Sequence, residues 1–188
     1  MKLPILFVTG NQNKLIEVIK ICGPEFADKI KAVSLDLPEL QGTTEEISRE
    51  KCQTASKLLN APVLVEDTAL CFEALNGMPG PFVKWFLKSI GPEGLSKLLD
   101  GFPDKRAYAL CTFAYCPAPG SPVQLFTGRT DGVIVSPRGP RDFGWDPIFQ
   151  PIGFDQTYAE MDKATKNSIS HRYKALMAVK EFLSGVCD

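Results

Sequence analysis

The sequence has only one histidine, no CxxC pair and no excess of charge of either sign. Its six cysteines are scattered along the chain, so a Cys/His zinc site is poorly supported. Against 22 acidic side chains stand 21 basic ones, which gives a net charge of −1. Without a global basic field we do not expect a nucleic-acid partner, although a local basic cluster would suit a small anionic ligand.

Long hydrophobic runs and several catalytic motifs are also missing. No segment reaches transmembrane length, and the apolar run at residues 3–8 is too short for a signal peptide. We therefore expect no membrane partner and a cytoplasmic protein with free, mostly buried thiols. The sequence contains no GxSxG serine motif, and its first glycine loop is neither a Walker A loop nor a GxGxxG loop.

The patterns that are present predict a single α/β domain over residues 1–188, with two lobes. A hydrophobic content of 44% and a charged content of 23% are ordinary for a globular chain. Short apolar runs bounded by turn residues predict strands, and helical periodicity predicts helices. The first half is expected to hold strands at residues 4–8, 32–37 and 62–65 and helices at residues 15–22 and 45–59.

The second half is expected to begin with two helices, at residues 82–90 and 95–99. The aromatic residues of the first are assigned to a buried core, with a second lobe or a dimer face as the alternative. Residues 107–116 and 123–135 flank a loop rich in proline and predict a β-hairpin. Ser170 opens a final helix with an apolar stripe that faces the core.

One candidate anion site follows the first predicted strand. Thr9, Gly10 and Asn11 lead into a helix that carries Lys14 in its first turn. Backbone N–H groups and the positive end of a helix dipole favour anions at such a place. An ordinary turn between strand and helix would show the same pattern.

Acidic residues follow two predicted strands. Glu66 and Asp67 come after the third strand and Glu39 after the second. Open α/β sheets bind ligands at the carboxyl ends of their strands, so these carboxylates could converge on one metal ion. The alternative is an acidic turn exposed to solvent.

The loop of Phe143, Gly144, Trp145 and Asp146 combines two large rings with a carboxylate. It suits a planar ligand, such as a nucleobase, held by stacking and by a hydrogen bond to the carboxylate. Rings that fill a corner of the core explain the loop equally well. Basic residues near turns and helix starts would complete a polyphosphate site with Mg²⁺, and together these features favour a nucleotide phosphohydrolase. The basic residues are Lys14, Lys51, Lys166 and Arg172.

Five short motifs, in their order and spacing, resemble the inosine triphosphate pyrophosphatases. The motifs are Thr9-Gly10-Asn11-x-x-Lys14, Val65-Glu66-Asp67-Thr68, Pro79-Gly80-Pro81, Phe143-Gly144-Trp145-Asp146 and Ser170-His171-Arg172. Two further stretches look like the eukaryotic branch of that family: Asp36-Leu37-Pro38-Glu39 with Gln41-Gly42, and Phe82-Val83-Lys84-Trp85-Phe86-Leu87. The resemblance covers essentially the whole chain. It implies a long twisted mixed β-sheet flanked by helices, in two lobes with a central active-site cleft.

The resemblance also implies an activity. Members of that family hydrolyse ITP, dITP and XTP to the monophosphate and pyrophosphate, which keeps deaminated purines out of DNA and RNA. It implies a cytosolic homodimer that uses Mg²⁺, with Mn²⁺ as a substitute. Two alternatives remain open: a nucleotide- or RNA-binding module without catalysis, and a related pyrophosphatase for other modified nucleotides.

Matching the motifs position by position implies residue roles. Asp67 would activate the attacking water and, with Glu39, would serve the metal. Substrate would be held by two groups of residues. Phosphate contacts would come from Thr9, Gly10, Asn11, Gln12, Asn13 and Lys14, with further substrate contacts from Lys51, Asp67, Thr68 and Lys166. The base pocket would be formed by Phe143, Gly144, Trp145, Asp146, His171 and Arg172.

Overall fold

A computed structural model describes residues 4–10, 12–38 and 40–186 of the chain. Within these residues seven strands form one mixed sheet in the order β2-β1-β3-β5-β6-β7, and β4 pairs with β3. The chain divides into two compact units. Unit 1 comprises Met1–Asp67, Cys111–Gly128 and Tyr173–Asp188, and unit 2 comprises Thr68–Leu110 and Arg129–Arg172. The α/β fold class with a mixed sheet flanked by helices is thus confirmed.

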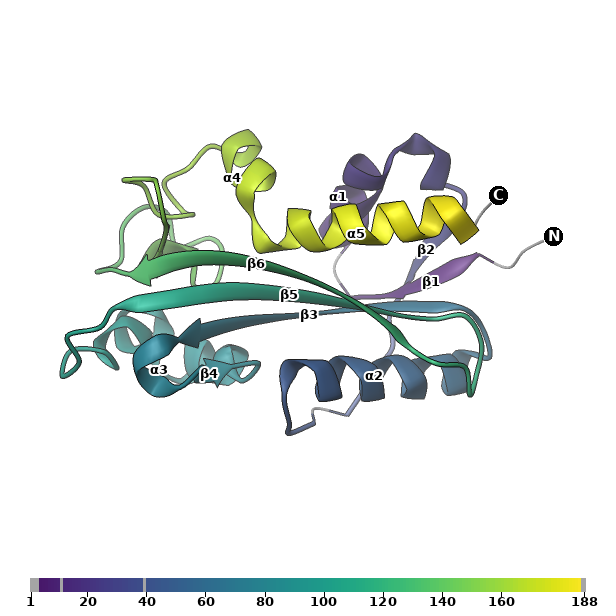
Figure 1. Ribbon diagram of the computed structural model, residues 1–188, viewed down its shortest axis with the longest axis horizontal. Coiled ribbons are helices and arrows are strands. Elements are labelled where there is room, and N and C mark those ends of the chain that lie inside the picture. Colours follow the sequence, from purple (N-terminus) through teal and green to yellow (C-terminus); the bar gives the residue numbers. More distant parts are fainter. Residues whose placement is uncertain (1–3, 11, 39, 187–188) are drawn as a thin grey trace. The chain divides into compact units, whose positions relative to one another are not determined.

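Unit 1 is built on parallel strands covered by helices on both faces. β1 (Ile5–Val8) pairs in parallel with β2 (Ile30–Val33) and with β3 (Val63–Phe72). In Figure 1, α1 (Gln12–Cys22) and α5 (His171–Val186) lie on one face of this part of the sheet and α2 (Thr44–Leu59) on the other. Two apolar clusters follow from this arrangement. One contains Leu64, Cys111, Val18, Leu176 and Val179, and the other contains Val63, Val65, Cys52, Ala55 and Cys116.

Local sequence signals explain how the helices of unit 1 begin and end. Thr43 and Glu46 form a capping box at the start of α2, with each side chain bonded to the backbone N–H of the other residue. The end of α1 coincides with Gly23, whose φ of 115° is one that other residues rarely adopt. Cys111 and Cys116 lie in different apolar clusters, because residues an odd number of positions apart on one strand point to opposite faces.

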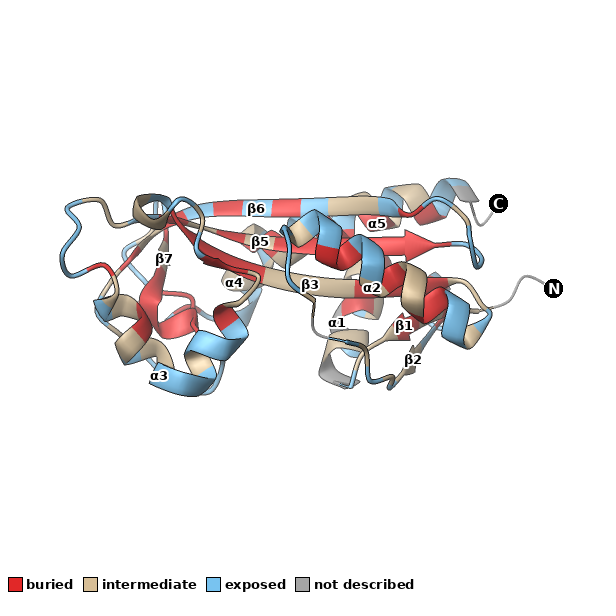
Figure 2. Ribbon diagram, turned by 90° about the horizontal axis from the view of Figure 1, so that it is seen from below, coloured by how far each residue is buried: buried red, intermediate tan, exposed pale blue. Residues whose placement is uncertain are grey.

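Unit 2 combines an antiparallel part of the sheet with its own core. β4 (Pro79–Gly80) pairs antiparallel with β3, and β7 (Phe149–Pro151) pairs antiparallel with β6 (Gln124–Ile134). Burial alternates along the second half of β6, so one side of it faces the core and the other faces solvent (Figure 2). The remaining elements are β5 (Arg106–Cys116), α3 (Val83–Lys97), α4 (Lys163–Ile169) and the 3₁₀ turns at Pro24–Phe26, Glu73–Leu75 and Asp146–Ile148.

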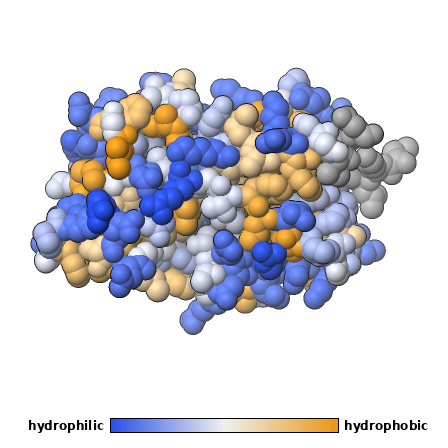
Figure 3. Space-filling model, in the orientation of Figure 1, coloured by the Kyte–Doolittle hydropathy of each residue, from blue (hydrophilic) through white to orange (hydrophobic). Residues whose placement is uncertain are grey.

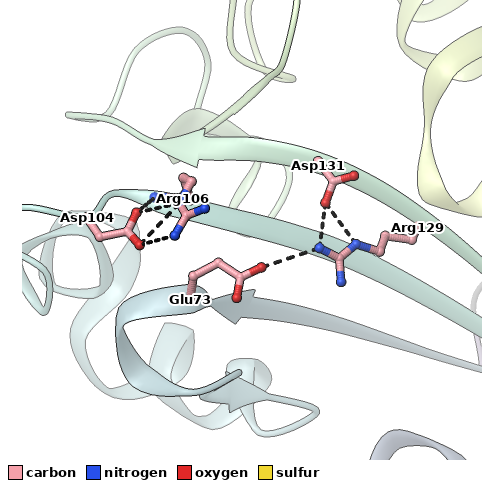
Figure 4. Close-up of polar contacts among 5 residues, drawn as sticks. All are labelled: Glu73, Asp104, Arg106, Arg129 and Asp131. Carbon is pink, nitrogen blue, oxygen red and sulfur yellow. Dashed lines mark hydrogen bonds and ion pairs between the residues drawn. The ribbon is translucent and has the colours of Figure 1, made fainter.

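Charged residues bridge neighbouring strands on the solvent side of unit 2. The Arg129 guanidinium on β6 lies 2.7 Å from Asp131 and 3.3 Å from Glu73, which follows β3 (Figure 4). It also lies 3.7 Å from the ring centroid of Tyr108 on β5. One arginine therefore links three adjacent strands, an arrangement suited to its flat, multidentate guanidinium.

Three expectations about elements were wrong. The second strand is β2 at Ile30–Val33 instead of residues 32–37, because the buried Ile30 enters the core while residues 34–37 form a loop. The third strand continues past Asp67 to Phe72, because four more buried residues follow Thr68. The rings on α3 are not core residues, since Trp85 is 46% exposed and Phe86 is also exposed.

The described cysteines are buried and free, which leads to a test by thiol labelling. The five are Cys22, Cys52, Cys71, Cys111 and Cys116. Burial raises the pKa of Cys52 to about 12 and those of Cys22 and Cys71 to about 11, so little thiolate forms at pH 8. With a disulfide reagent at pH 8, we expect at most one fast-reacting thiol per folded chain and six after denaturation. Two or more fast thiols in the folded protein would contradict this burial.

Candidate functional site

The expected phosphate-binding residues lie between β1 and α1. The Thr9 N–H donates to the Val33 carbonyl at 2.9 Å, and Gly10 follows in a bend. Lys14 lies in the first turn of α1, where the helix dipole favours an anion. The other expected members are only partly described: Asn11 lies outside the described residues, and Gln12 and Asn13 are described only as part of α1.

Lys14 is paired with a buried carboxylate in the middle of β3. Its Nζ lies 3.3 Å from Glu66 Oε2, and the Glu66 side chain is only 2% exposed. The Cys111 thiol on β5 lies 3.6 Å from the other carboxylate oxygen of Glu66. The lysine is therefore tied to the sheet by an ion pair.

Glu66 and Asp67 lie on opposite faces of the sheet. Successive residues of a strand point to opposite sides, and Leu64 packs in the cluster of α1 and α5 while Val65 packs in the cluster of α2. The positions of their lysine partners lead to the same conclusion, because Lys14 belongs to α1 on one face and Lys51 to α2 on the other. The hypothesis that Glu66 and Asp67 converge on one metal ion was therefore wrong, since β3 has neighbouring strands on both sides.

Asp67 is the more accessible of the two carboxylates. Its side chain is 21% exposed, and its Oδ1 accepts a hydrogen bond from Lys51 Nζ at 3.1 Å. Lys51 lies on α2, directly before Cys52, and both Cys52 and Ala55 are buried. Helix packing thus holds the lysine beside the carboxylate.

The Asp67 carboxylate is the kind of ligand that a divalent metal ion such as Mg²⁺ accepts. Mg²⁺ is commonly bound through one or two protein carboxylates, with water and phosphate oxygens filling its other positions. Asp67 supplies one partly exposed carboxylate, and Glu39, the second expected ligand, lies outside the described residues. The residues that the structure describes contain no cluster of three or more His, Cys, Asp or Glu side chains suited to a metal. A site of this composition would need substrate phosphate to complete it.

In unit 2, the two rings of the Phe143–Asp146 loop have different environments. Phe143 is 53% exposed, whereas Trp145 is buried. Gly144 between them has a φ of +46°, a backbone conformation that glycine adopts most readily. Both sequence interpretations therefore apply in part: Trp145 fills the core, and Phe143 presents a free ring surface.

Asp146 and Lys166 form a close ion pair beneath this loop. The Lys166 ammonium contacts Asp146 Oδ2, and the aspartate is almost fully buried. The same ammonium lies 4.8 Å from the Phe143 ring centroid and 5.3 Å from that of Tyr158. Lys166 belongs to α4, which begins after the N-cap Asp162. The structure thus places a donor, an acceptor and an exposed ring together.

His171 lies within a cluster of rings in unit 2. Its ring stacks on Tyr158 at 6.0 Å between centroids and lies 5.4 Å from Trp145. Phe149 also contacts Trp145 and Tyr158. Arg172 follows as the second residue of α5, and Thr68 lies in β3. The histidine is thus held by packing at the first position of α5.

The sequence analysis missed Tyr158, whose ring lies beside both His171 and Lys166. Burial raises the pKa of its phenol to about 12, so it remains protonated. Thr157 and Glu160 form the mutual hydrogen bonds of a helix cap, but the segment is a turn. The signal for Tyr158 was an aromatic residue inside a polar turn, which short-range patterns do not distinguish from a surface residue.

Comparisons with known proteins give a consistent result. The model of the Ham1 family matches residues 5–182. The inosine triphosphate pyrophosphatase of Batrachochytrium dendrobatidis is 61% identical over 184 residues, which is 98% of this chain and 96% of that protein.

Solved structures agree with the sequence comparisons. A HAM1 protein from Coxiella burnetii is similar with a TM-score of 0.87 and 29% identity, over 97% of this chain and 99% of that one. A nucleoside-triphosphatase, or dITP/XTP pyrophosphatase, from Mycobacterium abscessus is similar with a TM-score of 0.77 and 28% identity, over 94% and 97% of the two chains. Together with the fold and the two lysine–carboxylate pairs on β3, these matches show that the chain belongs to the Ham1 family.

Proposed function

We propose that this protein hydrolyses ITP, dITP and XTP to the nucleoside monophosphate and pyrophosphate. The observation that carries the proposal is Asp67, a partly exposed carboxylate in the middle of β3 with Lys51 at 3.1 Å. A carboxylate can accept a proton from water, and the adjacent ammonium can neutralise phosphate charge. The 61% identical inosine triphosphate pyrophosphatase supports the same reaction.

Asp67 is our candidate for the general base. Its carboxylate would orient a water molecule and accept its proton as the oxygen attacks phosphorus. Lys51 would then remain close to both the carboxylate and the phosphate groups. Lys14 and the backbone N–H groups that follow Thr9 would bind the remaining phosphate oxygens at the start of α1.

We assign Asp67 and Glu39 to a Mg²⁺ ion, for which Mn²⁺ would substitute. The bound ion would neutralise phosphate charge and polarise the scissile anhydride. Because substrate phosphate would supply some of the ligands of the ion, the protein does not need a preformed cluster of acidic residues to bind it. Omitting the metal should therefore abolish pyrophosphate release.

We assign binding of the nucleobase to the Phe143–Asp146 loop, together with Lys166, His171 and Arg172. Phe143 offers the exposed ring on which a base can stack. Lys166 is a donor suited to a 6-keto oxygen, and Asp146 is an acceptor suited to N1–H. Hypoxanthine and xanthine carry both groups, whereas adenine carries the reverse pair.

We also propose a cytoplasmic homodimer. The helix α3 exposes Trp85, Phe86 and Ile90, and apolar residues of this kind are enriched in protein interfaces. On the face drawn in Figure 3, hydrophobic residues form small groups separated by hydrophilic ones. Free buried thiols suit a reducing compartment, and no described helix is long and apolar enough to cross a bilayer. Sedimentation equilibrium that gave only monomer at micromolar concentration would reject the dimer.

Product analysis tests the proposed function directly. Purified protein should convert ITP, dITP and XTP to monophosphate and pyrophosphate when Mg²⁺ is present, and should release nothing in EDTA. ATP and modified pyrimidine triphosphates complete the substrate panel. Formation of IDP and orthophosphate would exclude this reaction, and a preference for a modified pyrimidine would favour the related activity. Binding of an oligonucleotide without turnover would indicate a binding module.

A further inference from the structure

The geometry points to Glu66 as a positioning residue for Lys14, with no direct role at the metal. This inference rests on the proposed function, because it treats Lys14 as a ligand of substrate phosphate. Glu66 lies beside Asp67 in the sequence, so adjacency alone would suggest two ligands for one cation. The structure instead gives the two carboxylates separate lysines on opposite faces of β3.

The environment of Glu66 suits a structural anchor. Its side chain is 2% exposed on a strand with neighbours on both sides, whereas Lys14 is 30% exposed. A carboxylate in this position is ionised at lower cost when an ammonium lies 3.3 Å away. The Cys111 thiol, 3.6 Å from Oε1, occupies the other side of the carboxylate with a neutral group. The fixed partner is therefore the glutamate, and the lysine is held against it.

This contact has a consequence for phosphate binding. A free lysine side chain has four rotatable bonds, and ordering it opposes binding. An ammonium group has three N–H donors, so the ion pair with Glu66 still leaves donors for phosphate oxygens. Glu66 would thus orient Lys14 before substrate arrives. Lys14 lies at the N-terminal end of α1, where the helix dipole already favours anions.

A double-mutant cycle tests the coupling. We expect Glu66→Gln to lower both kcat/KM for ITP and the affinity for inorganic pyrophosphate by roughly 10-fold. In a Lys14→Met background, the same change should lower either quantity by no more than about 2-fold, because its effect passes through Lys14. Equal losses in both backgrounds would overturn the inference, and so would tighter pyrophosphate binding by Glu66→Gln, which would mean that the carboxylate mainly repels phosphate.

Two further measurements separate positioning from other roles. The Mg²⁺ concentration for half-maximal activity should stay within about 2-fold of wild type in Glu66→Gln, whereas a metal ligand would raise it by roughly 10-fold or more. Glu66→Asp keeps the charge and should recover part of the lost pyrophosphate affinity. It also serves as the test variant if Glu66→Gln does not fold, and its coupling to Lys14→Met is then decisive.

A matched control is available in unit 2. Glu73→Gln removes the carboxylate of an ion pair with the same 3.3 Å N–O distance, to Arg129, and neither residue is assigned to the substrate (Figure 4). This variant should bind pyrophosphate as wild type does. The binding measurements need no turnover, so the Glu66–Lys14 coupling can be judged even if wild-type protein fails to hydrolyse ITP.

Discussion

Replacing Asp67 with asparagine should lower the single-turnover rate of ITP hydrolysis by about 10²- to 10⁴-fold. Asparagine has nearly the same shape but cannot accept a proton from water. It also removes the ion pair with Lys51, whose Nζ lies 3.1 Å from Oδ1. Since both side chains retain some solvent contact, folding should be little affected, and a thermal melt will check this. Wild-type turnover in this variant would remove Asp67 from the role of base.

The control for Asp67→Asn is Asp131→Asn. This change also removes one carboxylate from an ion pair, here with Arg129 at 2.7 Å on the solvent side of β6. Its turnover should stay within about 2-fold of wild type, as expected for a surface substitution. A Mg²⁺ titration then separates the two assigned roles of Asp67. Restoration of the rate at high Mg²⁺ would make metal binding its main role, whereas a rate that stays low at saturation supports proton transfer.

Local patterns predicted much of the fold because they depend on neighbours in the sequence. The capping box at Thr43, the stop of α1 at Gly23 and the apolar stripe of α5 are set by residues within one or two helical turns. The error at β3 had a different origin. Glu66 and Asp67 interrupt an apolar run and resemble a strand end, but lysines from α1 and α2 allow both carboxylates to remain within the strand. Nothing local to β3 indicates those partners.

The site was predicted less completely than the fold. Motif spacing identified Lys14, Lys51 and Lys166 as basic residues of interest, and each has a carboxylate partner in the structure. The face on which each carboxylate lies depends on strand direction and helix placement, so the residue pattern alone could not separate Glu66 from Asp67, and only the family resemblance singled out Asp67. The two rings of the Phe143–Asp146 loop were likewise indistinguishable, because the burial of Trp145 depends on Tyr158 and His171, which are distant in sequence.

The surroundings of Asp146 bear directly on which purine base the protein selects. Its carboxylate is buried, accepts hydrogen bonds only and contacts the Lys166 ammonium. A base that offers N1–H and a 6-keto oxygen can satisfy such an acceptor and donor together. Adenine offers an unprotonated N1 and an amino group, so it would set an acceptor against Asp146 and a donor against Lys166, and neither hydrogen bond could form. Mismatches of this kind can reject an analogue by roughly 10⁴-fold.

Asp146→Asn should therefore reduce the ratio of kcat/KM for ITP to kcat/KM for ATP by about 10²-fold. The asparagine amide can both donate and accept, so the acceptor that opposes adenine is lost, and the lost ion pair lowers ITP turnover itself. Asp162→Asn is the matched control, because Asp162 caps α4, the helix of Lys166, and asparagine caps equally well. Its ratio should be that of wild type. If Asp146→Asn slowed both substrates equally, Asp146 would only position Lys166, and base selection would then depend on the other donors near the loop.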